Sequence, residues 1–307
     1  MKKSKVVWDM DPGIDHALAL LLALKSPEIQ VLGITTVAGN APVEMTSANA
    51  RRVLEYMDIS ISVAMGATKP LKHPLVDALS YHGQDGLGEC GLPPPMLPLH
   101  RAKAWDFIAQ LVSDAFGEVT LVATGPLTNV AYAFRHHPEL PKFLTRLVLM
   151  GGAYGLTPYG KGNQTPFAEF NIWQDPEAAQ IVLNSGASIF AVGLDVSTNL
   201  TTCLNNQHLE QLKTSHASAA RLAAKLVEYV IKRHGHCEMR DPLALAVLLD
   251  ASLFDFTLVP LEVVTGDGWD RGITRISPSD SSHLIHVATT VDGNRFLELF
   301  LSRILEE

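Results

Sequence analysis

The sequence KVVWDMDPGIDHALALLLALK, residues 5–25, is the most informative part of this chain. Residues 5–9 are mostly apolar and predict a β-strand. An acidic turn follows, in which Pro12 and Gly13 interrupt regular structure. Residues 15–25 are apolar on most faces and predict a well-buried helix. A strand, a turn and a buried helix in this order predict the first unit of a helix-covered sheet.

The same alternation continues along the chain. Further strands are predicted at 29–37, 61–65, 119–123, 146–150, 188–192, 258–264 and 284–288. Helices are predicted at 42–57, 105–116, 126–136, 176–185, 205–214, 216–233, 242–249 and 293–305, with long loops at 66–99 and 151–174. The pattern predicts an α/β fold with a mostly parallel central sheet flanked by helices. We expect one domain over residues 1–307, with a helical addition around 200–250.

Composition narrows the class of protein. A chain of 307 residues buries roughly three quarters of its unfolded surface, so a large core is available. With 47% hydrophobic and 18% charged residues, intrinsic disorder is excluded. The net charge of −8, without a basic stripe, argues against nucleic-acid binding. The start lacks the apolar run of a signal peptide, and three scattered cysteines suit no disulfide framework, so we expect a cytoplasmic protein without membrane association.

Polar side chains follow six of the predicted strands. Parallel sheets bind ligands beyond the carboxyl ends of their strands, so these side chains are expected to share one pocket. In chain order they are Asp9, Asp11, Asp15, Asn40, His82, Asp85, Thr124, Asn163, Glu169, Asn171 and Asp195.

The turn after the first strand carries the strongest chemical signal. Asp9, Asp11 and Asp15 converge at a helix start, where like charges repel unless a cation lies among them. Carboxylate oxygens select Ca²⁺ or Mg²⁺. A helix-capping role explains one of the three carboxylates and leaves two unexplained.

Two other acidic-turn families fit poorly. An EF-hand needs glycine where Ile14 stands and glutamate where Leu20 stands. Phosphatases of the haloacid dehalogenase type also begin with Asp-x-Asp and use the first aspartate, here Asp9, as nucleophile. They usually continue with a small pair unlike Pro12-Gly13, so a metal phosphohydrolase remains only as a minor alternative.

The turn resembles the amino-terminal signature of the nucleoside hydrolases of the inosine–uridine-preferring type, which reads D-x-D-P-G-x-D-D-A. Further motifs similar to that family follow in order. They are residues 34–40 (ITTVAGN), 82–88 (HGQDGLG), 123–129 (ATGPLTN), 150–152 (MGG), 168–171 (AEFN), 175–178 (DPEA) and 241–242 (DP).

The resemblance implies hydrolysis of the N-glycosidic bond of ribonucleosides in purine or pyrimidine salvage, with a Ca²⁺ at the pocket floor. Asp11 would be the general base and a metal ligand, together with the Thr124 carbonyl, Asp241 and the residue at position 16. Asp9 would orient the site from behind. Substrate contacts would come from Asp15, Asn40, His82, Asn163, Glu169, Phe170, Asn171 and Arg240. Family members are commonly dimers or tetramers, so a homo-oligomer is expected.

His16 departs from the family pattern, which has an aspartate that binds the metal at this position. Imidazole is a poor Ca²⁺ ligand and suits Zn²⁺, Mn²⁺ or Fe²⁺ better. Three outcomes follow from the sequence. The site binds Ca²⁺ weakly, it takes a softer metal, or it holds none and hydrolysis is slow or absent.

Arg240 is the second departure, because one large subgroup has a histidine there that protonates the leaving base. Arginine stays charged at neutral pH and is a poor general acid. It would instead contact the edge of the base or stabilise its negative charge. Tyr229, His234 and His236 are alternative acids. The sequence therefore predicts a ribonucleoside hydrolase, with a degenerate nucleoside- or ribose-binding protein as the alternative.

Overall fold

The computed structural model describes residues 3–277 and 283–307. Its strands are β1 (Ser4–Met10), β2 (Ile29–Thr36), β3 (Val63–Met65), β4 (Leu99–His100), β5 (Val119–Ala123), β6 (Leu144–Met150), β7 (Ile189–Val192), β8 (Phe254–Val263), β9 (Thr274–Ile276) and β10 (Leu284–Val291). They form one sheet in the order β4-β3-β2-β1-β5-β6-β7-β10-β8-β9. Pairing is parallel from β4 through β7 to β10, whereas β8 and β9 are antiparallel. The predicted α/β class with a mostly parallel sheet is confirmed.

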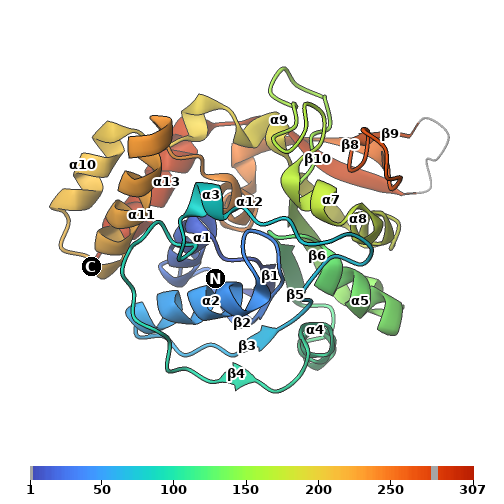
Figure 1. Cartoon of the computed structure of the whole chain (residues 1–307), viewed down its shortest axis with the longest axis horizontal. Helices are drawn as coiled ribbons and strands as arrows, with labels where there is room; N and C mark the ends of the chain where they lie inside the picture. The colour runs from blue at the N-terminus through green and yellow to red at the C-terminus, as the bar shows by residue number, and fades with distance from the viewer. Residues whose placement is uncertain (1–2, 278–282) are drawn as a thin grey trace.

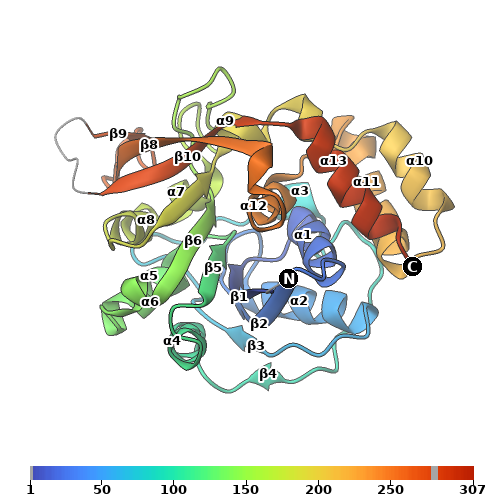
Figure 2. The same cartoon turned by 180° about the vertical axis from the view of Figure 1, so that it is seen from behind.

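Helices cover both faces of this sheet (Figure 1). They are α1 (Ile14–Leu24), α2 (Val43–Tyr56), α3 (Leu79–His82), α4 (Ala104–Asp114), α5 (Thr128–His136), α6 (Leu140–Phe143), α7 (Phe170–Gln174), α8 (Pro176–Leu183), α9 (Leu194–Ser197), α10 (Asn206–Thr214), α11 (Ser218–His234), α12 (Arg240–Leu249) and α13 (Gly293–Leu305), with 3₁₀ turns η1 (Leu200–Thr202) and η2 (Ala251–Leu253). The predicted helical addition is α10 to α12. Helices α10, α11 and α13 lie at the end of the molecule opposite β8 and β9, whereas α12 lies nearer the middle, beside α1 (Figure 2).

Strand β1 lies at the centre of the sheet and shows why both faces are apolar. Trp8 and Met10 join a core that includes α1, α11 and α12, whereas Val7 joins the core beneath α4 and α5. Alternate side chains of a strand point to opposite faces, so one short strand contributes to two cores. Helix α1 is buried on nearly every side, as its apolar sequence predicts.

The structure differs from the sequence prediction in several segments. The expected loop 66–99 contains α3, and the expected loop 151–174 ends in α7. The late strands predicted near 258 and 284 begin or end several residues away, at β8 and β10. Strand β9 has no counterpart in the prediction, because three residues give too short a pattern to detect.

Candidate active site

A cavity of about 320 Å³ lies where the carboxyl ends of the parallel strands meet the starts of α1 and α12. Its lining brings together every predicted site residue except Asp11. Those residues are Asp15, His16, Asn40, His82, Thr124, Asn163, Glu169, Phe170, Asn171, Arg240 and Asp241. Asp9, Asp85 and Asp195, the other polar residues predicted at strand ends, do not line it.

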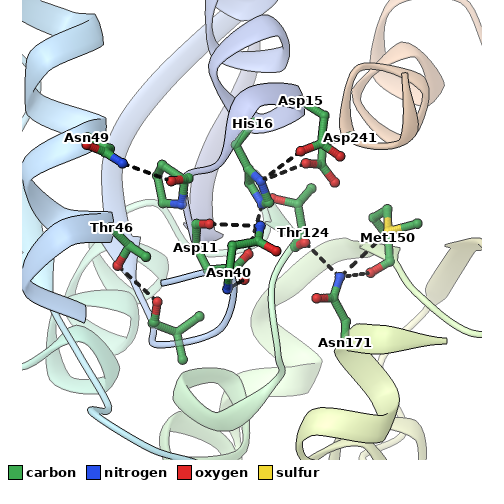
Figure 3. A network of polar contacts seen from close by, with 12 residues as sticks. Asp11, Asp15, His16, Asn40, Thr46, Asn49, Thr124, Met150, Asn171 and Asp241 are labelled. Carbon is green, nitrogen blue, oxygen red and sulfur yellow. Dashed lines mark hydrogen bonds and ion pairs between the residues drawn. The ribbon is translucent and has the colours of Figure 1, made fainter. Parts of the chain in front are cut away.

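Asp11 lies behind the cavity wall and is fully buried. Its Oδ2 atom accepts a hydrogen bond of 2.7 Å from the backbone N–H of Asn40, and its carbonyl accepts one of 3.1 Å from the Asn40 side chain. Its Oδ1 atom lies 3.0 Å from Nε2 of His16. The imidazole ring therefore separates the predicted general base from the cavity (Figure 3).

His16 occupies the centre of the pocket floor because α1 and α12 pack against each other. Its Nδ1 atom lies 2.8 Å from Oδ2 of Asp241 and 3.6 Å from Oδ1 of Asp15. Burial disfavours a charged ring, but the carboxylates of Asp241 and Asp11 outweigh it and hold the pKa of His16 well above its usual value. The floor thus consists of three acidic side chains arranged around one imidazole ring.

The floor matches a Ca²⁺ site only in part. Asp15, His16 and Asp241 place ligand atoms within 4.8 Å of one another, a grouping that can hold a metal ion. Asp11 lies outside this group, on the opposite edge of the ring. The Thr124 carbonyl already accepts a 2.9 Å hydrogen bond from the Asn171 side chain. Because Ca²⁺ prefers oxygen ligands, this donor set does not fit a Ca²⁺ held jointly by Asp11 and Asp241.

His82 forms one wall of the cavity and differs from His16 in its partner. Its Nδ1 atom accepts a 3.1 Å hydrogen bond from the backbone N–H of Ile14, so the neutral ring carries its proton on Nε2. Burial lowers the pKa of His82 to about 4. The ring lies against Gly13, where an added Cβ would come within 2.6 Å of it. Gly13 therefore makes room for the neutral imidazole.

Helix α7 supplies another wall. Glu169 caps this helix, accepting hydrogen bonds from the backbone N–H groups of Asn171 and Ile172, and it also accepts one from Gly152. The Asn171 side chain then donates to the carbonyls of Thr124 and Met150 (Figure 3). This cap fixes the amide of Asn171 at the junction of β5 and β6.

Asn163, Phe170 and Arg240 line another side of the cavity. The Asn163 side chain accepts a 2.8 Å hydrogen bond from the backbone N–H of Phe170, which orders the loop beside that ring. Arg240 is mostly buried and forms an ion pair with Glu238. Of the alternative acids, Tyr229 and His236 do not line the cavity, and His234 stacks on Tyr81 at 4.8 Å between ring centroids. Arg240 is the cation on this side of the cavity.

Asp9 lies behind the cavity lining. It is fully buried and accepts hydrogen bonds from Thr35 (2.6 Å) and Asn129 (2.8 Å). Burial raises its pKa to about 7 despite these donors. Asp9 therefore ties β1 to β2 and α5 beneath the pocket.

The sequence analysis missed some of the lining residues. They are Asp77, Ala78, Ser80, Tyr81, Met150 and Gln164. Tyr81 directly precedes His82, and its ring meets that imidazole edge-on at 5.0 Å. The only available signal was this adjacency, because 66–99 gave no regular periodicity and α3 is four residues long.

The chain is similar in sequence and in fold to known nucleoside hydrolases. A family profile described as inosine-uridine preferring nucleoside hydrolase matches residues 6–298. A pyrimidine-specific ribonucleoside hydrolase RihA of Salmonella arizonae is 36% identical over 310 residues, covering 97% of each chain. Two solved structures superpose with a TM-score of 0.91. They are a plant nucleoside hydrolase (31% identity, 99% of each chain) and a purine-preferring ribonucleoside hydrolase of Gardnerella vaginalis (32%, 98% of each).

The family profile spans nearly the whole chain, and the relatives are matched over almost their full length. The matched range contains all the sequence motifs that resemble this family. The chain therefore belongs to the inosine-uridine preferring nucleoside hydrolase family and is a nucleoside N-ribohydrolase, a hydrolase of N-glycosyl bonds.

Proposed function

We propose that this hydrolase acts on ribonucleosides and discriminates against 2′-deoxyribonucleosides. The observation that carries this is the density of polar side chains around one small cavity: Asp15, Asn40, Asn163, Glu169 and Asn171 all line it. Such groups match the ribose hydroxyls. A substrate that lacks the 2′-hydroxyl would leave buried polar atoms unpaired, which such sites reject strongly.

The charge of the cavity suits the reaction. Cleavage of an N-glycosidic bond passes through an oxocarbenium-like transition state, in which the ribose becomes positive. Asp15 and Asp241 present carboxylates to the cavity. Burial and their contacts with His16 hold them in place before the reaction, so they stabilise the developing charge without reorganisation.

Deprotonation of the attacking water is assigned to the cluster of Asp11, His16 and Asp241. Asp241 is the member whose carboxylate lines the cavity, and Asp11 contacts the far edge of the imidazole ring. The attacking water would pass its proton to the carboxylate of Asp241, because Asp11, the base in the resemblance, does not line the cavity. The Ca²⁺ implied by the family enters no step here, because the floor does not fit it.

The leaving base would lie between Phe170, Tyr81 and Arg240, all of which line the cavity. The neutral ring of His82 offers an Nε2–H on the same wall. Because the guanidinium of Arg240 is always charged, it stabilises negative charge on the departing base and does not protonate it.

The test is release of free ribose. Purified protein is incubated with uridine, cytidine, inosine, adenosine and guanosine, and with their 2′-deoxy analogues. We expect release from at least one ribonucleoside and a kcat/KM about 10²-fold or more lower for its deoxy analogue. Equal rates would contradict the ribose contacts. Nucleoside binding without any release would support the degenerate binding protein instead.

Three expectations stay predictions. They are a single domain over residues 1–307, a homo-oligomeric state and a cytoplasmic location. Within residues 3–277 and 283–307, none of the helices has the length and apolar character needed to traverse a bilayer.

A further inference from the structure

The side chain of His16 fills the space between two buried carboxylates. Nε2 lies 3.0 Å from Asp11 and Nδ1 lies 2.8 Å from Asp241, so each nitrogen of the ring faces its own acid. The side chain is 3% exposed. Figure 3 shows the His16 ring between Asp11 on one side and Asp15 and Asp241 on the other.

Charge balance gives this placement a physical meaning. With aspartate at position 16, as in the family pattern, the floor would hold four carboxylates, and burying them would require a strong external cation. Histidine removes one of these carboxylates and adds a ring that can carry positive charge. Asp11, Asp15 and Asp241 then face an imidazole ring that belongs to the chain itself.

Distances leave little room for an ion as well. Ca²⁺ lies about 2.3–2.6 Å from its oxygen ligands. The ring nitrogens of His16 already lie 3.0 Å from the Asp11 oxygen and 2.8 Å from the Asp241 oxygen, on the side where such an ion would have to sit. An ion shared by Asp11 and Asp241 would therefore overlap the ring. The ring would have to leave a buried site and abandon both contacts for such an ion to enter.

We propose that the imidazole ring of His16 replaces the divalent metal of this family between Asp11 and Asp241, so that this enzyme binds no Ca²⁺ at its pocket floor and works without added metal. Of the measurements below, only ribose release rests on the proposed function, whereas metal content, metal titration and Tm do not.

The first experiment measures metal directly. Protein is purified without chelator, its metal content is determined, and it is titrated with Ca²⁺, Mn²⁺ and Zn²⁺ by calorimetry. We expect no stoichiometric metal and no saturable binding. We also expect Tm values in EDTA and in CaCl₂ that agree within about 1 °C, because an ion that binds only the folded state raises Tm. Ribose release should be equally unchanged by EDTA.

The second experiment restores the family residue. His16→Asp should gain about one Ca²⁺ per chain, with Tm raised by about 5 °C in saturating Ca²⁺. His216→Asp is the matched control, because it makes the same change at an exposed position and should gain nothing.

Stoichiometric Ca²⁺, Mn²⁺ or Zn²⁺ in the unaltered protein would overturn the proposal, as would a folded His16→Asp variant that binds no Ca²⁺. If the unaltered protein binds no metal but also releases no ribose, the proposed reaction fails while the metal replacement stands. If it releases ribose only with a bound metal, the replacement fails while the reaction stands.

Discussion

The floor and the wall of the pocket each contain one buried histidine, and the two rings are held in opposite ways. On the floor, His16 lies among carboxylates that raise its pKa. On the wall, His82 accepts a backbone N–H and its pKa falls to about 4. Burial opposes charge on both rings, so the neighbours decide the outcome. The neighbours thus shift the pKa of the same residue type upward in one place and leave it lowered in the other.

The largest expected effect comes from removing the floor cation. His16→Leu leaves the carboxylates of Asp11 and Asp241 buried without their partner, which costs about 3–5 kcal/mol of unfolding free energy. Urea unfolding at pH 7 measures it, with His216→Leu at an exposed position as control. A loss below about 1 kcal/mol would mean that the ring carries no charge there.

The next effect is on catalysis. Asp241→Asn keeps the shape of the floor but removes a carboxylate that lines the cavity. We expect kcat/KM for the best ribonucleoside to fall about 10³-fold, equivalent to about 4 kcal/mol. Asp114→Asn, an exposed change, should leave kcat/KM unaltered. Unchanged kcat/KM in Asp241→Asn would remove Asp241 from the proposed chemistry.

The wall histidine is tested by pH. Between pH 6.5, the ordinary pKa of histidine, and about 4, the unfolded chain holds a proton on residue 82 that the folded protein lacks. Stability contributed by the neutral ring is therefore present above pH 6.5 and is lost as the pH falls toward 4. The loss amounts to about 3 kcal/mol.

We would measure the free energy of unfolding at pH 7 and at pH 4.5 for the unaltered protein and for His82→Gln. The difference between the two proteins gives the pH-dependent stability that comes from His82. The variant should lose less stability on acidification, whereas the exposed control His216→Gln should follow the unaltered protein. Identical pH dependence in His82→Gln would show that the wall ring is protonated as easily in the folded state as in the unfolded one.

The smallest expected effect on stability comes from filling the space between Gly13 and the His82 ring. Gly13→Ala places a Cβ 2.6 Å from the His82 ring and should cost about 1–3 kcal/mol of stability while raising KM. Gly266→Ala is the control, because the nearest atom to its added Cβ lies 4.0 Å away. A neutral Gly13→Ala would mean that the His82 ring moves aside freely.

Much of this site was predictable from the sequence because its motifs follow strands, and parallel strands end at one edge. That rule placed Asp15, Asn40 and Asn171 in one cavity although they lie far apart in the chain. It failed for Tyr81, which stands on the short α3 inside a long connection. It also failed for Asp11, because the sequence does not show which side chain lies in front of another.

The sequence by itself determined the α/β class, the family and the identity of most of the residues around the cavity. Apolar periodicity and ordered motifs are properties of the chain that need no knowledge of packing. The tertiary structure alone decided what His16 does. Its charge depends on Asp11, five residues away, and on Asp241, more than two hundred residues away, and only the packing of α1 against α12 brings all three together.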